Sequence, residues 1–440
     1  MGSSAQGRTP SSSPLATWSA LGEGSRLRLT GAEVTQVELD LRRPVGTALG
    51  SHTGRPVVMV QLVAEGPGGR TVGWGECAAL ADTTFDKEDA DGAFKTLTQD
   101  LLPRLTSGSS SETPPGAVPL PGPSSLAERV RPPGVPLAFA ALEMAVADVH
   151  LRASGISLAE VLGVTGSNAR ETESQETADH RDNSPKDPDH PDRLSVPVGA
   201  VVGTTGRVET LLDQVDEQVD RGFARVKLKI GPGWDVVPVT AVRRRHPDLM
   251  LQVDANGSYS RTDVTHLTEL DGLDLACIEQ PFGSDDLEGH ALLARSMRTP
   301  VCLDESLHSP DSVRSALAMG ACEVVCVKPA RLGGLTAALE VYRDCADAGA
   351  PMWVGGMFES GYARSVNTAL AALPGFVLPG DLAPAANYLT EDLVAAPLVH
   401  RQAPDGRLRV AVHLGPGLAP APDHEVLARR TVASWSWSAG

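Results

Sequence analysis

Short apolar runs, each closed by a charged residue, recur through the middle of the chain at a nearly constant interval. Such runs end at Lys229, Asp254, Glu279, Asp304 and Lys328, at steps of 25, 25, 25 and 24 residues. An apolar run rich in Val, Leu, Ile or Cys is typical of a buried parallel strand. The interval leaves room for one strand, one helix and two loops, so the pattern predicts repeated β–α units.

The same pattern continues on both sides of these five runs. We expect one strand before them, at 196–202, and two after them, at 353–356 and 374–381. Helical periodicity separates the runs, for example at 208–221, 309–319 and 335–348. Eight parallel strands of this kind close into a barrel whose strands all end at one mouth. We therefore predict an α/β fold with a (β/α)8-type, or β7α-like, barrel over residues 194–381.

The N-terminal third has a different pattern, because its apolar residues alternate with polar ones. Strands are expected at 28–41, 57–64 and 71–77, helices at 87–102 and 158–162, and an amphipathic helix at 137–153. The polar, glycine-bearing segments 42–55 and 78–86 are interpreted as loops. The sequence thus predicts a separate α+β domain over residues 26–163.

The remaining segments carry few large apolar side chains. Residues 1–25 are rich in Ser, Gly and Pro, and residues 164–193 are highly charged, so we predict that both are disordered. Residues 106–134 are interpreted as an irregular excursion. Residues 382–440 are expected to return to the N-terminal domain, with 407–412 pairing with its sheet. The final W-S-W-S gives no prediction.

The composition excludes several classes of partner. The 440 residues carry 38 Lys and Arg against 55 Asp and Glu, a formal net charge of −17, so we expect no nucleic-acid partner. The N-terminus lacks the apolar segment of a signal peptide, and the most apolar helical run is too short for a membrane span. The six cysteines form no C-x-x-C pair and are expected to be small buried side chains. We therefore predict a cytoplasmic protein without a membrane partner.

Three carboxylates end three successive predicted strands. Asp254, Glu279 and Asp304 would converge at the barrel mouth and repel one another unless a cation lay among them. Oxygen ligands without thiolate or imidazole select a hard ion, so we predict Mg²⁺ first and Mn²⁺ second. Asn256 and Glu305 follow these acids and are expected to hydrogen-bond the ligands. A single acid at a strand end more often caps a helix, but three at equal spacing favour the metal site.

Lysines flank these carboxylates along the chain. Lys227 and Lys229 alternate on one predicted strand, so both side chains face the same way. Two adjacent ammonium groups lower each other's proton affinity, which would let one of them act as a general base. Lys328 ends a strand beyond the carboxylates, so a carboxylate substrate would have a lysine on each face of its α-carbon. The predicted chemistry is metal-assisted removal of an α-proton.

The motifs K-L-K, V-D-A-N, I-E-Q-P, C-L-D-E-S, V-K-P-A-R-L-G-G and G-G-M-F-E-S-G resemble those of the enolase superfamily. Within it, the chain is most similar to the o-succinylbenzoate synthase / N-succinylamino acid racemase family of the muconate-lactonizing-like group. The resemblance runs from about residue 27 to residue 415 and includes W-G-E-C at 74–77. It implies a barrel closed by an N-terminal capping domain, whose loops around 46–54 and 79–85 cover the mouth.

The resemblance also implies roles for single residues. The metal would be Mg²⁺, bound by Asp254, Glu279 and Asp304. Lys229 would be the base, assisted by Lys227, and Lys328 would be the opposing lysine. The substrate pocket would be lined by Gly356, Met357, Glu359 and Ser360.

Two positions bear on which substrate fits. Arg331 matches an arginine of the racemase-capable members, although a solvated loop residue is an equally good interpretation. The family often has Asn-Ile where this chain has Cys326 and Val327. This departure leaves the predicted metal ligands and lysines intact.

Two reactions need this set of groups. One is the dehydration of 2-succinyl-6-hydroxy-2,4-cyclohexadiene-1-carboxylate to o-succinylbenzoate, a step of menaquinone biosynthesis catalysed by a carbon–oxygen lyase. The alternative is N-acylamino acid racemisation, with Lys229 and Lys328 exchanging protons from opposite faces. A non-catalytic binding protein on the same fold is a third possibility, against which the intact acids and lysines argue. We expect a homo-oligomer that acts on a small-molecule carboxylate.

Overall fold

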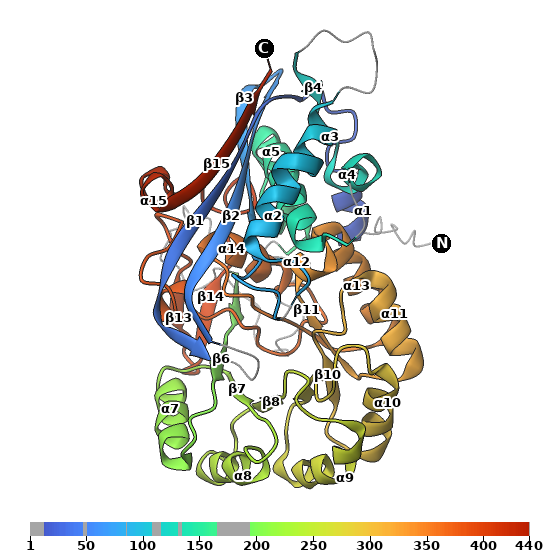
Figure 1. Cartoon of the computed structure of the whole chain (residues 1–440), viewed down its shortest axis with the longest axis vertical. Coiled ribbons are helices and arrows are strands. Elements are labelled where there is room, and N and C mark those ends of the chain that lie inside the picture. The colour runs from blue at the N-terminus through green and yellow to red at the C-terminus, as the bar shows by residue number, and fades with distance from the viewer. Residues whose placement is uncertain are drawn as a thin grey trace, which may run out of the picture.

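Seven parallel strands within the described residues form the wall of a barrel (Figure 1). The structure is a computed structural model that describes residues 13–46, 51–84, 86–107, 116–130, 134–164 and 194–439. In spatial order the strands are β12, β11, β10, β9, β8, β7 and β6. Their bounds are β6 (Gly199–Val202), β7 (Arg225–Lys229), β8 (Leu251–Asp254), β9 (Ile278–Glu279), β10 (Val301–Leu303), β11 (Val324–Val327) and β12 (Met352–Val354). The α/β barrel predicted from the regular interval is thus confirmed.

The eighth position of the wall is filled without a regular strand. Phe376 forms a parallel bridge to β12, and Gly380 forms one to the residue that precedes β6. Pro374 and Pro379 have no backbone N–H, so this segment cannot form a continuous ladder. The strand predicted at 374–381 is therefore reduced to two isolated bridges that close the barrel.

The C-terminal hairpin joins the barrel and not the N-terminal sheet. β14 (Leu408–Ala411) pairs antiparallel with β13 (His400–Gln402) and with β5 (Ser195–Pro197), which leads into β6. Val410 is fully buried there, in a cluster that includes Val196 and Phe223. The pairing predicted for 407–412 is wrong because this apolar cluster lies at the start of the barrel.

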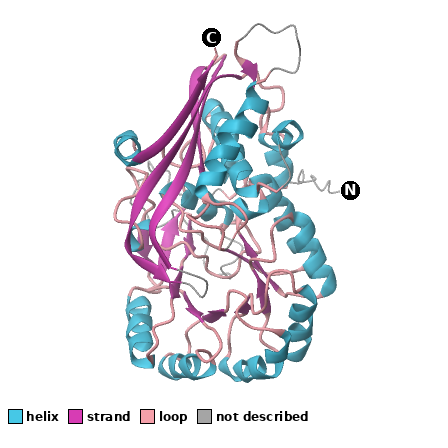
Figure 2. Cartoon of the chain, in the orientation of Figure 1, coloured by secondary structure: helices cyan, strands magenta, loops and turns pink. Residues whose placement is uncertain are grey.

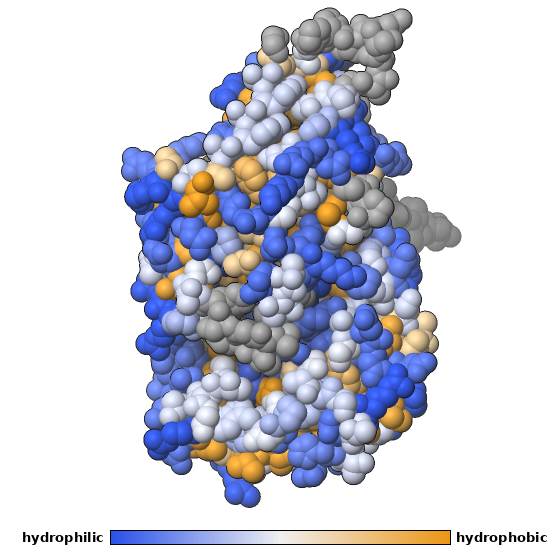
Figure 3. Space-filling model, viewed as in Figure 1, coloured by the Kyte–Doolittle hydropathy of each residue, from blue (hydrophilic) through white to orange (hydrophobic). Residues whose placement is uncertain are grey.

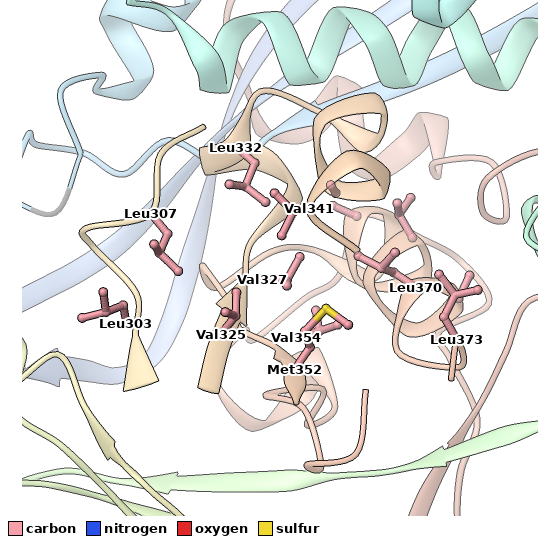
Figure 4. Packing of buried hydrophobic residues seen from close by; sticks show 14 of the residues in the cluster. Leu303, Leu307, Val325, Val327, Leu332, Val341, Met352, Val354, Leu370 and Leu373 are labelled. Carbon is pink, nitrogen blue, oxygen red and sulfur yellow. The ribbon is translucent and has the colours of Figure 1, made fainter. Parts of the chain in front are cut away.

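Helices cover the outside of the barrel (Figure 2). The three predicted helices are confirmed as α7 (Val208–Asp220), α11 (Pro310–Met319) and α13 (Leu335–Ala348). The ring also contains α8 (Val236–Arg245), α9 (Val264–Leu267), α10 (Leu287–Ser296) and α14 (Gly361–Leu370). The short helix α12 (Pro329–Leu332) instead follows β11 at the barrel mouth, and all four of its residues are buried. Figure 4 shows Val325 and Val327 of β11 among the apolar side chains that pack against these helices. Because strand side chains alternate, the residues between and after them, Cys326 and Lys328, face the barrel interior.

A second, antiparallel sheet lies above the barrel in Figure 1. Its path is β15 (Thr431–Ser438), β1 (Arg28–Gly46), β2 (Ser51–Gly66) and β3 (Gly69–Cys77). The loop predicted at 42–55 is mostly strand, since Val45 pairs with His52 and Gly46 with Ser51. Neighbouring strands pair through backbone hydrogen bonds, so polar residues can form strands that the side-chain pattern does not reveal. Residues 47–50 lie outside the described part of the chain.

Helix α5 (Pro136–Ser154) packs on this sheet and is buried from Leu137 to Leu151. The helix predicted at 137–153 is confirmed, but its predicted amphipathic character is wrong, because the sheet covers one side and barrel elements cover the other. The approach to β3 is close: a Cβ on Gly75 would lie 1.9 Å from the carbonyl oxygen of Ala141. Glu143 of α5 accepts a hydrogen bond from Thr336 N at 3.2 Å, which fixes α5 to the start of α13.

Several segments predicted to be irregular have regular structure. Within 106–134 lie β4 (Val118–Pro119) and α4 (Pro123–Val130).

The helix predicted at 87–102 is divided into α2 (Ala90–Thr96), a π-helical turn (Leu97–Leu101) and α3 (Leu102–Thr106). The shorter helix predicted at 158–162 is confirmed as α6 (Leu158–Val161). The end of the chain forms α15 (His424–Arg430) and β15, so W-S-W-S belongs to a strand that pairs with β1. The predicted disordered segment at 164–193 falls, from 165 onwards, outside the described residues.

The surface seen in Figure 3 is mostly hydrophilic, with smaller apolar areas near the lower edge. In the described parts of the chain, every helix is too short or too polar to span a membrane.

The described part of the N-terminal segment is helical, which corrects the disorder predicted for 1–25. Helix α1 (Pro14–Ser19) begins at Ser13, whose side chain accepts a hydrogen bond from Ala16 N. Trp18 has 0% of its surface exposed, and its Nε1 donates to Thr336 Oγ1 at 2.8 Å. Trp18 packs in a core cluster together with Leu21 and Leu15, and these apolar residues anchor the segment beside α13.

We predict that Trp18→Ala lowers the free energy of unfolding by about 3 kcal/mol, because it removes a fully buried indole. Urea-induced unfolding followed by circular dichroism measures the change. Val237→Ala, at a position that is 72% exposed, is the control and should change the value by less than about 0.5 kcal/mol. A Trp18→Ala variant as stable as this control would contradict the docking of α1.

Candidate active site

The predicted site residues meet at the carboxyl ends of the barrel strands. Lys229, Asp254 and Glu279 are the last residues of β7, β8 and β9. Asp304 and Lys328 directly follow β10 and β11. The three acids are only 1%, 0% and 3% exposed, so three carboxylates lie buried at one end of the barrel. Their charges need cations close by.

Lys227 supplies one of these cations from inside the barrel. Its Nζ lies 3.1 Å from Glu279 Oε2, 3.3 Å from Asp254 Oδ2 and 3.0 Å from Asp381 Oδ2. Burial alone would lower the pKa of Lys227, but these carboxylates outweigh burial and raise its pKa well above the usual value. The predicted mutual lowering by two lysines is therefore wrong for Lys227, since its nearest charged partners are acids.

Lys229 lies nearer the opening and is held by two groups. Its Nζ is 2.7 Å from Asp254 Oδ2 and 2.6 Å from Asn256 Oδ1. Asn256 has a positive φ of 43°, which lets its backbone N–H donate to Asp254 Oδ1 at 3.0 Å. Its side-chain amide donates to Glu305 Oε1 at 2.9 Å. The residues after the acids thus orient both the acid and the lysine.

Lys328 and Arg331 both bind Asp304. The Lys328 Nζ lies 2.7 Å from Asp304 Oδ2, and the Arg331 guanidinium donates to Oδ1 of the same acid. Burial would raise the pKa of Asp304, but Arg331 and Lys328 more than offset it and lower the pKa. Arg331 is only 3% exposed and also donates to Asp86 Oδ1 at 2.8 Å. The interpretation of Arg331 as a solvated loop residue is therefore wrong.

The two outer lysines stand on opposite sides of the carboxylates. Lys229 ends β7 and Lys328 follows β11, and the strands β8, β9 and β10 lie between them in the sheet. A small carboxylate held above the acids would therefore lie between two ammonium groups.

The donor set fits a divalent cation. Burial and the charge of Asp254 raise the pKa of Glu279 to about 8, which shows how strongly the crowded acids repel. Oε2 of Glu305 is buried without a hydrogen-bond partner among the described residues. Ligand atoms of Glu279, Asp304 and Cys326 lie within 4.8 Å of one another. Asp254 is not part of that group, and its oxygens are held by Lys227, Lys229 and the backbone N–H of Asn256.

Two of the four predicted pocket residues lie beside Lys328. Met357 and Glu359 line a small cavity that also contacts Lys328 and has room for about one water molecule, ≈ 10 Å³. The carboxylate of Glu359 is already held by Met357 N at 2.8 Å and Arg364 Nη2 at 2.9 Å. Gly356 is half-buried, and a Cβ there would lie 3.1 Å from the carbonyl oxygen of Asp381.

Ser360 links the two domains. It is fully buried, and its Oγ donates to Glu76 Oε2 at 2.5 Å. Glu76 is the penultimate residue of β3 in the upper sheet, and its other oxygen accepts from Ser360 N at 2.8 Å. Both polar groups of Ser360 are therefore occupied within the protein, and Ser360 does not line the cavity beside Lys328.

Arg55 is a buried residue that the sequence did not single out. Its guanidinium donates to the carbonyl oxygens of Phe358 at 2.9 Å and Met357 at 3.2 Å, next to the predicted pocket. It also donates to Ala78 at 2.9 Å and Ala79 at 2.5 Å, in the loop after β3. Because these four acceptors are backbone atoms far away in the chain, no local pattern could have revealed this role.

Asp381 was also missed. Its Oδ1 accepts from Arg225 Nη2 at 2.5 Å, and its Oδ2 pairs with Lys227. Arg225 also donates to Gln252 at 2.6 Å, and Gln252 donates to Glu279 at 2.6 Å. Asp381 closes the last apolar run of the barrel, so the strand-end pattern that identified the other acids could have found it.

Known proteins share this sequence and fold. The profile of the Enolase C-terminal domain-like family matches residues 210–426. An N-succinylamino acid racemase from Amycolatopsis sp is 38% identical over 408 residues, which span 92% of this chain and 98% of that protein. An o-succinylbenzoate synthase from Bacillus subtilis is 32% identical over 394 residues, spanning 89% and 93%. A solved enolase superfamily structure from Listeria innocua superposes with a TM-score of 0.79 at 31% identity, and the match covers 94% of this chain and 100% of that one.

These similarities cover nearly the whole chain, including the buried acids and lysines of the barrel mouth. The chain therefore belongs to the enolase superfamily, within the family that contains the o-succinylbenzoate synthases and N-succinylamino acid racemases, which are enzymes acting on small molecules.

Proposed function

We propose that this chain is a Mg²⁺-dependent o-succinylbenzoate synthase of menaquinone biosynthesis. It would dehydrate 2-succinyl-6-hydroxy-2,4-cyclohexadiene-1-carboxylate to o-succinylbenzoate. The observation that carries the proposal is the buried row of three carboxylates with a lysine on each side. The similarity to the synthase from Bacillus subtilis supports this choice of substrate.

Asp254, Glu279 and Asp304 are the residues that would hold Mg²⁺. All three are buried at the ends of neighbouring strands and present oxygen atoms, the donors that Mg²⁺ prefers. When bound, the ion stabilises negative charge that develops on the substrate carboxylate as the α-proton leaves. Asn256 and Gln252 hydrogen-bond two of these acids, which keeps their oxygens directed towards the mouth.

Lys229 is proposed to be the base. Its amine takes the α-proton, the C–O bond of the 6-hydroxyl group then breaks, and the same proton leaves with the hydroxide as water. The electron pair of the C–H bond completes the aromatic ring, and the stability of this ring favours the dehydration. Asn256 Oδ1 and Asp254 Oδ2 position the amine from one side. Lys227 stays charged and binds the acids beneath, so it assists without transferring the proton.

Lys328 is proposed to face the opposite side of the substrate as a cation. Its alkyl chain passes the backbone at Gly355, directly after β12, where an added Cβ would lie 2.6 Å from Lys328 Cε. Only glycine leaves room for this course. Asp304 then fixes the ammonium group at 2.7 Å, where it stabilises the enediolate oxygens by charge.

N-Succinylamino acid racemisation is the second candidate. It is favoured by the presence of Lys328 opposite Lys229, because a racemase needs a proton carrier on each face. The racemase from Amycolatopsis sp is also more similar to this chain, at 38%, than the synthase from Bacillus subtilis, at 32%. Both reactions begin with the same loss of an α-proton.

We predict that the protein with Mg²⁺ dehydrates the cyclohexadiene substrate, and that Lys229→Ala lowers turnover about 10³-fold, because it removes the general base. Absorbance of the aromatic product measures turnover. Arg343→Ala, at an exposed ion pair on α13, is the control and should retain full turnover.

The same proteins incubated with an N-succinylamino acid in D₂O separate the two candidates. Dehydration without α-deuterium incorporation identifies a synthase only. Exchange without dehydration would replace the proposed function by racemisation, and near-normal turnover of Lys229→Ala would contradict the assignment of the base.

We predict that Gly355→Ala lowers turnover about 10²-fold, since a new methyl group displaces Lys328 by about 1 Å. Gly272→Ala is the matched control, because a Cβ at Gly272 meets no atom within 4 Å. Steady-state kinetics of both variants give the comparison. Equal turnover of the two variants would show that the position of Lys328 does not matter.

A further inference from the structure

We propose that Cys326 gives the barrel mouth a second, thiol-containing site that binds a thiophilic divalent cation such as Cd²⁺ or Zn²⁺. This inference rests on the proposed function in one respect: the site shares Glu279 and Asp304 with the proposed Mg²⁺ site. Cys326 itself has no part in the proposed reaction. Its thiol would make the mouth sensitive to soft metal ions, which would block the site.

The three donors are already close together. One ligand atom each from Glu279, Asp304 and Cys326 lies within 4.8 Å of the other two. The three residues are 0%, 3% and 2% exposed, so bulk water does not compete for them. Donors around a tetrahedral ion lie roughly 3.5 Å apart. Side-chain rotations, together with movement of the two ammonium groups that now hold the acids, would form the site.

The position of Cys326 on β11, next to β12, places its thiol beside the two acids. Val325 and Val327 face the helices, so Cys326 between them faces inward. It packs beside Trp353, its partner residue on β12. A Cβ on Gly355 would lie 2.6 Å from the Cys326 sulfur. The glycine that makes room for Lys328 thus also leaves the thiol beside the acids.

The chemistry of the donors selects the ion. A thiolate prefers soft or borderline ions, whereas Mg²⁺ prefers oxygen donors alone. On binding, the thiol gives its proton to the solvent and the sulfur forms a bond to the ion. Three protein ligands leave a fourth position for water, as in zinc sites that stay open.

The ion must displace two ammonium groups. Lys227 Nζ lies 3.1 Å from Glu279 Oε2, and Lys328 Nζ lies 2.7 Å from Asp304 Oδ2. An ion bound to these carboxylates therefore changes the position of both lysines. The same two acids cannot serve the soft ion and Mg²⁺ at once, so the two ions compete.

A cadmium titration tests the proposal. The full-length protein is treated with a chelator, dialysed and titrated with CdCl₂ while the ultraviolet thiolate-to-cadmium charge-transfer absorbance is followed. We expect one Cd²⁺ per chain, and added MgCl₂ should move the titration to higher Cd²⁺ concentrations. Cys326→Ser and Cys326→Ala should both lose the absorbance band, and circular dichroism checks that each variant is folded.

Two other buried thiols are the controls. Cys302 lies in the same interior cluster as Cys326, and Cys345 lies on α13 away from the mouth. Cys302→Ser and Cys345→Ser should keep the band. The proposal is overturned if the wild type shows no band, if the band survives in a folded Cys326 variant, or if Cys302→Ser removes it instead.

The titration needs no substrate, so its failure and the failure of the proposed function are distinguishable. A cadmium band without any turnover would contradict the synthase and leave the thiol site standing. Turnover with Mg²⁺ but no cadmium band would support the synthase and contradict the thiol site.

Discussion

Three carboxylates buried at one end of a barrel repel one another, and the surrounding structure compensates for that repulsion. Leaving one such charge unpaired would cost roughly 3–5 kcal/mol. Lys227 lies beneath the acids, and Lys229 and Lys328 flank them on either side. The proposed chemistry depends on the same arrangement, because groups that neutralise the acids also surround the place where a substrate carboxylate would lie.

The upper domain is attached to this charged cluster by buried polar groups. Arg331 bridges Asp304 and Asp86, so one acid of the mouth is connected to the loop that follows β3. Arg55 binds backbone carbonyls of that loop and of the loop after β12. These contacts join the upper domain to the loops that surround the barrel mouth.

The sequence predicted the features that depend on local pattern. A buried parallel strand must be apolar and must end where the barrel opens, so the positions of Lys229, Asp254 and Glu279 followed from spacing alone. Features that depend on distant partners were not predictable. Helix α5 was expected to be amphipathic, yet its acids Glu143 and Asp148 are buried and accept hydrogen bonds from backbone amides of other elements. Arg55 gave no signal for the same reason.

The central claim is that Asp254, Glu279 and Asp304 form one divalent cation site. Anomalous diffraction from crystals soaked in MnCl₂ tests it most directly, because Mn²⁺ takes oxygen ligands as Mg²⁺ does and its position is measured without reference to activity. The account predicts one strong anomalous peak bonded to oxygens of all three acids, with Lys229 and Lys328 on opposite sides of it. A peak that lacks any of the three acids, or no peak at the barrel mouth, would contradict the account.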